Sequence, residues 1–128
     1  PRKELNEMCF GELEGRLESD IFSQLKEYLE NKAHYQFPRG ENYDLVSARV
    51  EKVVKKILLE SQKFNVLIVG HQAVNRAILG SLVDFPKEIF VNIDQPHHVI
   101  FEISERKTLF YHDIIKKKRG KYIRVRMR

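Results

Sequence analysis

Apolar residues recur at spacings of three and four in two segments of the chain, which is the pattern of a helix that buries one face. The longer segment spans roughly residues 42–62, and its apolar positions are Leu45, Val46, Val50, Val53, Val54, Ile57 and Leu58. The shorter segment spans about residues 19–31, with Ile21, Phe22, Leu25, Tyr28 and Leu29 on one face. Ser19 or Asp20 is expected to cap it. The pattern therefore predicts two amphipathic helices, separated by a loop at 35–44.

A different pattern follows the longer helix. The run from Phe64 to Val69 is apolar, short and rich in β-branched residues, which predicts a buried strand inside a parallel sheet covered on both faces. A further helix is expected over about residues 72–82, and residues 87–97 are expected to be irregular. Alternating positions over 98–104 and 107–113 predict two strands joined by a turn. Helices interleaved with strands indicate an α/β layered fold.

Composition narrows the class of protein. The chain has 128 residues, of which 42% are hydrophobic and 32% charged, so it has enough apolar material for one core and too much for a disordered chain. Cys9 is the single cysteine, which rules out an intrachain disulfide and favours a reducing compartment. The longest apolar runs fall far short of the roughly 20 residues that a membrane span needs. We expect a cytoplasmic protein with no signal peptide and no membrane partner.

The positive charge is concentrated at the carboxyl end. The net charge is +5, and residues 116–128 contain eight Lys or Arg and no acid. We therefore divide the chain into a domain over 1–115 and a basic tail over 116–128. The tail resembles a nucleic-acid-binding segment, but a solvated extension or an edge strand is the favoured interpretation.

The candidate chemistry lies where the predicted strand meets the next helix. Ligands bind at the carboxyl ends of strands in open α/β sheets, and Gly70, His71 and Gln72 occupy such a position. The helix N-terminus favours an anion there, and Arg76 follows Gln72 by one turn, with a fork of donors that suits a phosphate. The alternatives are that His71 is a helix cap and that Arg76 is a surface cation.

Three motifs in order carry a family resemblance. "GHQAVNRAIL" resembles the second histidine motif of the histidine phosphatase superfamily, which has the phosphoglycerate mutase-like fold. "LNEMCFGELEG" at 5–15 resembles its acid motif, and "FPRGENYDL" with Arg49 resembles its Pro-x-Gly-Glu-Ser segment and helical arginine. The resemblance covers about residues 5–104, and within the family it is strongest to fructose-2,6-bisphosphatases. It implies a layered α/β fold with a mostly parallel sheet covered by helices, here incomplete at its amino end.

The resemblance also implies roles for individual residues. Glu7 corresponds to the general acid that protonates the leaving oxygen, and His71 to the second histidine that binds the transferring phosphoryl group. Substrate contacts are implied for Arg39, Tyr43, Gln72 and Arg76, and a structural or phosphate-site role for Glu41. His98 matches a histidine with a packing or supporting role. The family reaction needs no metal and no cofactor.

One family motif has no counterpart in these residues. The nucleophilic histidine of the family lies in an Arg-His-Gly motif, and no Arg-His-Gly occurs here. We expect phosphomonoester hydrolysis through a phosphohistidine, with fructose 2,6-bisphosphate as the leading substrate and little activity from this chain alone. Mutase activity, another sugar-phosphate phosphatase and a non-catalytic phosphate-binding protein are the alternatives. The expected partners are a small phosphorylated sugar, and a second copy or upstream domain that supplies the missing half-site.

Overall fold

The computed structural model describes residues 2–104 and 107–122. Short 3-10 turns at Lys3–Leu5, Gly11–Leu13 and Glu18–Ile21 precede and separate the first elements. The helices are α1 (Phe22–Glu30), α2 (Tyr43–Ser61), α3 (Gln72–Val83) and α4 (Lys87–Phe90). The strands are β1 (Val99–Ile103), β2 (Leu109–Asp113) and β3 (Lys118–Lys121), which form one antiparallel sheet in the order β1-β2-β3.

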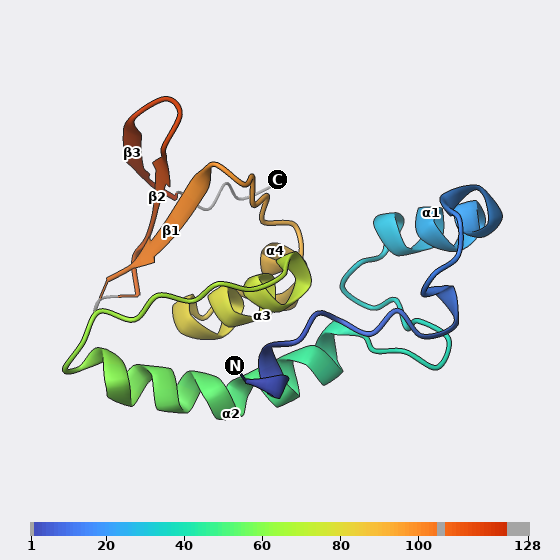
Figure 1. The fold of residues 1–128 in the computed structure, drawn as a ribbon, viewed down its shortest axis with the longest axis horizontal. Coiled ribbons are helices and arrows are strands. Elements are labelled where there is room, and N and C mark those ends of the chain that lie inside the picture. The colour runs from blue at the N-terminus through green and yellow to red at the C-terminus, as the bar shows by residue number, and fades with distance from the viewer. Residues whose placement is uncertain (1, 105–106, 123–128) are drawn as a thin grey trace.

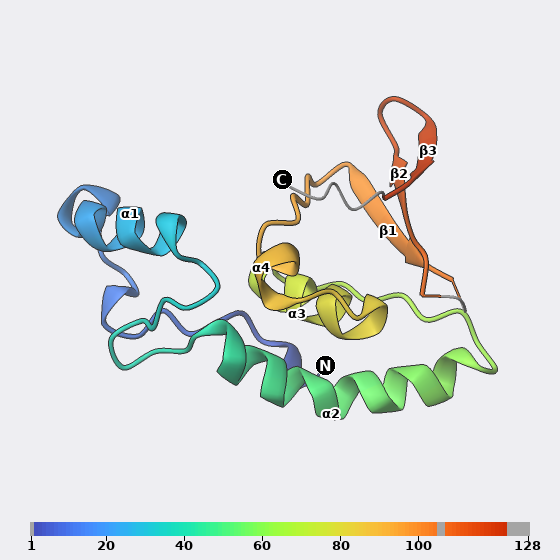
Figure 2. The same ribbon diagram turned by 180° about the vertical axis from the view of Figure 1, so that it is seen from behind.

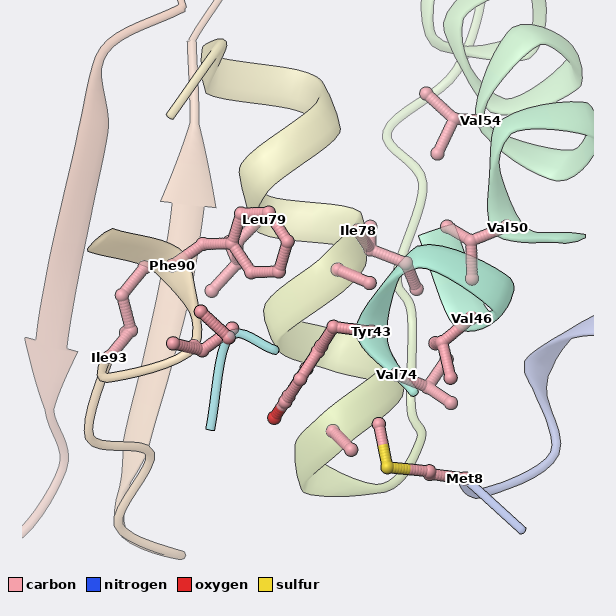
Figure 3. Packing of buried hydrophobic residues seen from close by; sticks show 14 of the residues in the cluster. Met8, Tyr43, Val46, Val50, Val54, Val74, Ile78, Leu79, Phe90 and Ile93 are labelled. Carbon is pink, nitrogen blue, oxygen red and sulfur yellow. The ribbon is translucent and has the colours of Figure 1, made fainter. Parts of the chain in front are cut away.

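Helices α2 and α3 lie side by side and form the centre of the molecule (Figures 1 and 2). The sheet lies beyond α3 and α4, and α1 lies apart from the sheet, past the N-terminal end of α2. The core fills the space between α2 and α3, with Val46, Val50 and Val74 fully buried (Figure 3). This arrangement holds the loop before α2 beside the N-terminal half of α3.

The helices predicted over 42–62 and 72–82 are confirmed as α2 and α3. The Asn42 side chain caps α2 by accepting a hydrogen bond from the Leu45 N–H at 2.9 Å. At the C-terminal end of α3, Asp84 adopts a left-handed conformation with φ 54°, which ends the helix. Residues 87–97, expected to be irregular, include the short helix α4.

Helix α1 differs from the prediction at its start and on its apolar face. Residues 18–21 form a 3-10 turn, and neither Ser19 nor Asp20 caps the helix, because their side chains bond to each other at 3.2 Å. Ile21 is buried, but Phe22 and Leu29 are 70% and 62% exposed. The helical spacing was correct, yet the described chain offers no second layer to cover that face.

The prediction of a buried parallel strand at 64–69 was wrong for the described structure. Residues 65–70 are extended but pair with no strand, and Leu67 and Val69 are 79% and 85% exposed. A strand exists only when a neighbour satisfies its backbone groups, and no described strand pairs with this segment, although Ile68 packs against the core. The sheet that does form is antiparallel, so the mixed helix and sheet class is confirmed while the parallel arrangement is not.

The predicted hairpin at the carboxyl side is confirmed. Strand β1 pairs with β2 in the register Val99–Asp113 to Ile103–Leu109. The turn expected at Glu105 and Arg106 lies outside the described residues. The first part of the predicted basic tail forms the edge strand β3, and residues 123–128 lie outside the description. The boundary at residue 115 stays a prediction.

Among the described residues, none of the helices combines the length and apolar character needed to cross a membrane.

Candidate functional site

Two glycines allow the loop at 8–13 to touch the loop at 37–41. Glu41 N–H donates to Cys9 O at 2.7 Å, and Glu12 N–H donates to Pro38 O at 2.9 Å. A Cβ on Gly11, which has φ +58°, would lie 2.0 Å from Pro38 O, and one on Gly40 would lie 2.5 Å from Cys9 O. Backbone approach this close is open only to glycine. The acid motif and the Pro-Arg-Gly-Glu segment are therefore held together.

A charged pair ties both loops to α2. Arg49 Nε and Nη2 donate to the two carboxylate oxygens of Glu41 at 2.8 Å and 3.0 Å, and Cys9 N–H donates to the same carboxylate at 2.9 Å. Burial raises the pKa of Glu41, but the bonds from Arg49 and Cys9 outweigh it and hold that pKa below its usual value. Arg49 also donates to the carbonyl oxygens of Glu4 and Glu7. Glu41 and Arg49 thus position the segment that contains Glu7.

Glu7 is the predicted general acid, and it is half-buried at the end of that segment. Its carboxylate accepts a hydrogen bond from the Met8 N–H at 2.8 Å, and Met8 itself is buried in the core. The backbone here is anchored by buried Met8 and by the bond from Arg49 to the Glu7 carbonyl oxygen. A carboxyl group held in this way has the fixed position that proton transfer to a leaving oxygen requires.

His71 lies at the N-terminus of α3, as the sequence predicted for that helix. It occupies the N-cap position, but its side chain makes no capping hydrogen bond and is exposed. The turn before it is braced by Asn75, whose amide donates to Gly70 O at 3.0 Å. The interpretation of His71 as a capping side chain does not hold. The ring and the adjacent exposed Gln72 are accessible to a ligand at the helix N-terminus.

Arg76 is buried and has no carboxylate partner in the described chain. It is 7% exposed, and its Nε donates to Ile93 O at 2.9 Å, whereas the terminal nitrogens make no hydrogen bond there. A buried charge without a counter-ion is costly. This burial rules out the alternative of a surface cation and leaves the terminal nitrogens available to an anionic ligand.

Lys32 and Tyr28, which the sequence did not indicate as site residues, lie near Arg76. Burial and then the positive charge of Arg76 lower the pKa of Lys32, against the opposing charge of Asp94. Burial, then Tyr43 and Glu7, raise the pKa of Tyr28, against the charge of Arg76. Neither residue belongs to a motif, so spacing along the chain held no signal for them. The only sequence signal for Lys32 as a site residue was its positive charge just after α1.

Tyr43 is buried in the core beside α3, and its ring packs against Phe90 at a centroid distance of 5.8 Å (Figure 3). Its hydroxyl is buried and has no hydrogen-bond partner in the described chain. Buried hydroxyls are nearly always bonded, and the Tyr28 side chain, whose pKa is raised by burial and then by Tyr43, lies close to this one. Tyr43 is thus both a core residue and a candidate donor.

Arg39, another predicted site residue, is exposed on the loop before α2. Its side chain is 86% exposed and lies 3.2 Å from Glu12, and its backbone is left-handed with φ 54°. The structure thus gathers Glu7, Tyr43 and Arg76 with Tyr28 and Lys32, leaves His71 and Gln72 at the helix end, and places Arg39 on the loop tip. A shallow hollow of about 210 Å³ adjoins Lys32. In the described residues, no cluster of three or more metal-ligating side chains occurs.

Comparison with known families matches residues 1–111 to the model of the histidine phosphatase superfamily, branch 1. A 6-phosphofructo-2-kinase/fructose-2,6-bisphosphatase of Caenorhabditis elegans is 33% identical over 108 residues, which are 81% of this chain and 23% of the relative. One from Arabidopsis thaliana is 35% identical over 104 residues, covering 78% of this chain and 14% of the relative. The chain therefore spans less than a quarter of the length of these relatives.

A solved structure supports the same fold. The alpha-ribazole phosphatase of Shigella flexneri matches with a TM-score of 0.60 and 25% identity, and the alignment covers 95% of this chain and 58% of that one. The sequence relatives and the structural neighbour agree on one family while their names carry different substrates.

Proposed function

The chain belongs to the histidine phosphatase superfamily, and from this premise we propose that it contributes the acid and half of the phosphate pocket to phosphomonoester hydrolysis through a phosphohistidine. The leading substrate is fructose 2,6-bisphosphate, which the names of the sequence relatives support. Buried Arg76, which has no carboxylate partner among the described residues, carries the proposal, because an anionic ligand is the natural counter-ion for it.

The residues divide the chemistry between them. A histidine nucleophile attacks phosphorus, so a P–N bond forms as the ester P–O bond breaks. Glu7 gives its proton to the departing alkoxide, and His71 donates to an equatorial phosphoryl oxygen at the start of α3. Water then attacks the phosphohistidine and releases inorganic phosphate. Because these 128 residues contain no Arg-His-Gly, the nucleophile is expected from outside them.

The remaining candidates hold the rest of the substrate. Arg76 and Lys32 supply positive charge, the Tyr43 hydroxyl is a donor, and Gln72 is exposed beside His71. Arg39 extends from the loop tip, where it reaches a second phosphate. The cationic side chains supply the positive charge that metal ions supply in other phosphoryl transfers.

A non-catalytic phosphate-binding role, which would use the same cationic residues, is the second candidate. Such a protein binds sugar phosphates and releases no product. Turnover of fructose 2,6-bisphosphate by the full partner-containing protein would exclude it. A phosphoglycerate mutase or another sugar-phosphate phosphatase would use the same site with a different substrate. The expected cytoplasmic location suits all of them.

Calorimetric titration with fructose 2,6-bisphosphate, with fructose and with inorganic phosphate tests the site in this chain. We expect binding of the bisphosphate and none of fructose, and a loss of at least about tenfold in Arg76→Met, given the strength of charged contacts to phosphate. Gln72→Ala, at an exposed position, is a second variant that leaves the core intact. Arg119→Met, on the outer face of the sheet, is the matched control. Equal affinity in Arg76→Met and Arg119→Met would reject the site.

An activity assay of the chain alone tests whether the nucleophile lies outside these residues. We expect hydrolysis of fructose 2,6-bisphosphate and para-nitrophenyl phosphate well below about 1 s⁻¹, the low end of ordinary turnover. A faster rate that disappears in His71→Ala would show that the chain holds its own nucleophile.

A further inference from the structure

The hairpin of β2 and β3 lies largely beyond the region that the family shares. The family model ends at residue 111, whereas β2 runs to Asp113, and residues 114–117 turn into β3. Figures 1 and 2 show this hairpin projecting away from the helices. The proposed phosphatase function uses none of these residues.

The tip of the hairpin combines exposed aliphatic and basic side chains. Ile114 and Ile115 are 57% and 73% exposed, and Lys116 and Lys117 complete the four-residue turn. Turns in hairpins are ordinarily polar, with Gly, Asn or Asp. Two adjacent exposed isoleucines at a projecting turn therefore indicate a surface that meets an apolar partner.

Hydrogen bonds hold the turn between β2 and β3 in one conformation. The buried Asp113 carboxylate accepts a hydrogen bond from the Lys116 N–H at 2.8 Å, and Ile114 N–H donates to His98 O at 2.9 Å. The Nε2 of His98 lies 3.8 Å from the same Asp113 carboxylate. A tip held by these contacts loses little conformational freedom when it binds.

The lysines around the tip, unlike Arg119, are not neutralised by carboxylates of the described residues. Glu102 pairs with Arg119 and His112, and Asp113 points into the turn. Within the described residues, no carboxylate lies within ion-pair distance of the four lysines around the tip, which are Lys116, Lys117, Lys118 and Lys121. The result is an aliphatic tip surrounded by free positive charge.

We propose that this hairpin tip, defined as residues 114–118 with Arg119 and Lys121, binds an anionic phospholipid surface. Ile114 and Ile115 enter the boundary between headgroups and acyl chains, and the lysines contact headgroup phosphates. An anionic membrane binds basic side chains through its headgroups and also offers an apolar layer that exposed aliphatic side chains can enter. The sequence pattern predicts no membrane partner, whereas the exposure of Ile114 and Ile115 in the folded hairpin favours one.

A nucleic acid fits the tip less well. Single strands are bound by exposed aromatic faces between cations. The Phe110 ring on this hairpin is already covered by the Arg119 guanidinium, 4.1 Å from its centroid. Isoleucines offer a nucleic acid neither stacking nor hydrogen bonds.

Vesicle flotation of the 128-residue chain tests the proposal. The probes are phosphatidylcholine vesicles with and without about 30% phosphatidylserine, because basic residues respond to anionic lipid. We expect binding to the anionic vesicles, weakened by salt, and none to the neutral ones. Equal partition to both vesicle types, or to neither, would overturn it.

Two paired variants separate charge from apolar insertion. Lys116→Glu with Lys117→Glu and Ile114→Ser with Ile115→Ser should each weaken binding by about tenfold or more. The matched controls are Lys52→Glu with Lys56→Glu and Leu58→Ser with Leu59→Ser, which alter exposed positions on α2 and should bind as the wild type does. If the isoleucine pair has no effect, the surface is a site for soluble polyanions and the membrane proposal fails.

A fluorescence measurement reports insertion directly, since the chain contains no tryptophan. Ile115→Trp should show a blue-shifted emission when phosphatidylserine vesicles are added, whereas Leu59→Trp should not shift. Unshifted emission of Ile115→Trp, with the protein bound to vesicles, would contradict insertion of the tip.

Discussion

Arg49 on α2 donates two parallel hydrogen bonds to Glu41, and with them connects the loop before α2 to the segment that contains Glu7. The two side chains are 22% and 21% exposed, so the pair is largely shielded from solvent screening. Paired donors on a fixed carboxylate determine orientation as well as distance. The acid of the proposed reaction is therefore positioned by a charge pair that acts through the backbone at Glu7.

Removing the arginine should destabilise the whole assembly of loops. Arg49→Met leaves the half-buried Glu41 carboxylate without its partner, and we expect the free energy of unfolding to fall by about 2 kcal/mol. Urea denaturation at neutral pH measures this. Lys55→Met, which removes the exposed ion pair to Glu51, is the control and should change stability by under about 0.5 kcal/mol. An equal effect of both substitutions would contradict the argument.

Glu41 should also make the free energy of unfolding depend on pH in the acid range. Its pKa in the folded protein lies below the ordinary value of 4.5, so the folded state binds its proton less readily than the unfolded chain. The stabilisation is therefore fully present above 4.5 and is lost as pH falls from there through the lower folded-state pKa. Glu41→Gln should flatten this acid limb in urea titrations at a series of pH values. Glu51→Gln, at an exposed position, should retain the wild-type profile.

Two glycines with positive φ should respond differently to alanine. A Cβ on Gly15, with φ +72°, meets nothing within 4 Å, so Gly15→Ala should cost only the conformational penalty of about 1 kcal/mol. Gly11→Ala has the same kind of penalty and also drives a Cβ into Pro38 O, and we expect a loss of about 3 kcal/mol or more. Chemical denaturation of both variants gives the comparison. Similar losses would show that the loops separate without cost.

The extended segment at 65–70 should drive self-association of this chain. Its exposed Leu67 and Val69 and unpaired backbone form a template for strand pairing. Leu67→Asp with Val69→Asp should convert the chain to a monomer in size-exclusion chromatography with unchanged unfolding free energy. Leu59→Asp, on the exposed side of α2, should leave the association intact. A wild-type chain that elutes as a monomer at all concentrations would refute the prediction.

Local pattern was sufficient wherever an element depends mainly on its own residues. The helix at Tyr43–Ser61 follows from apolar spacing and the Asn42 cap, and the helix at Gln72–Val83 from the same spacing after His71. The β1–β2 hairpin pairs with a sequence neighbour, so alternation predicted it. These elements position the segment with Glu7 and the end of α3 with His71. Their residue types carried the family resemblance.

By itself, the sequence determined the family, the main helices and the identity of Glu7, His71 and Arg76 as candidates. Tertiary structure alone decided that 64–69 pairs with no described strand, that Arg76 is buried without a carboxylate partner among the described residues, and that Lys32 lies near it. The physical reason is that periodicity records which face of an element is apolar, whereas burial of a charge and pairing of a strand depend on segments distant in the chain. The exposed isoleucines of the β2–β3 turn belong to the same class of tertiary fact.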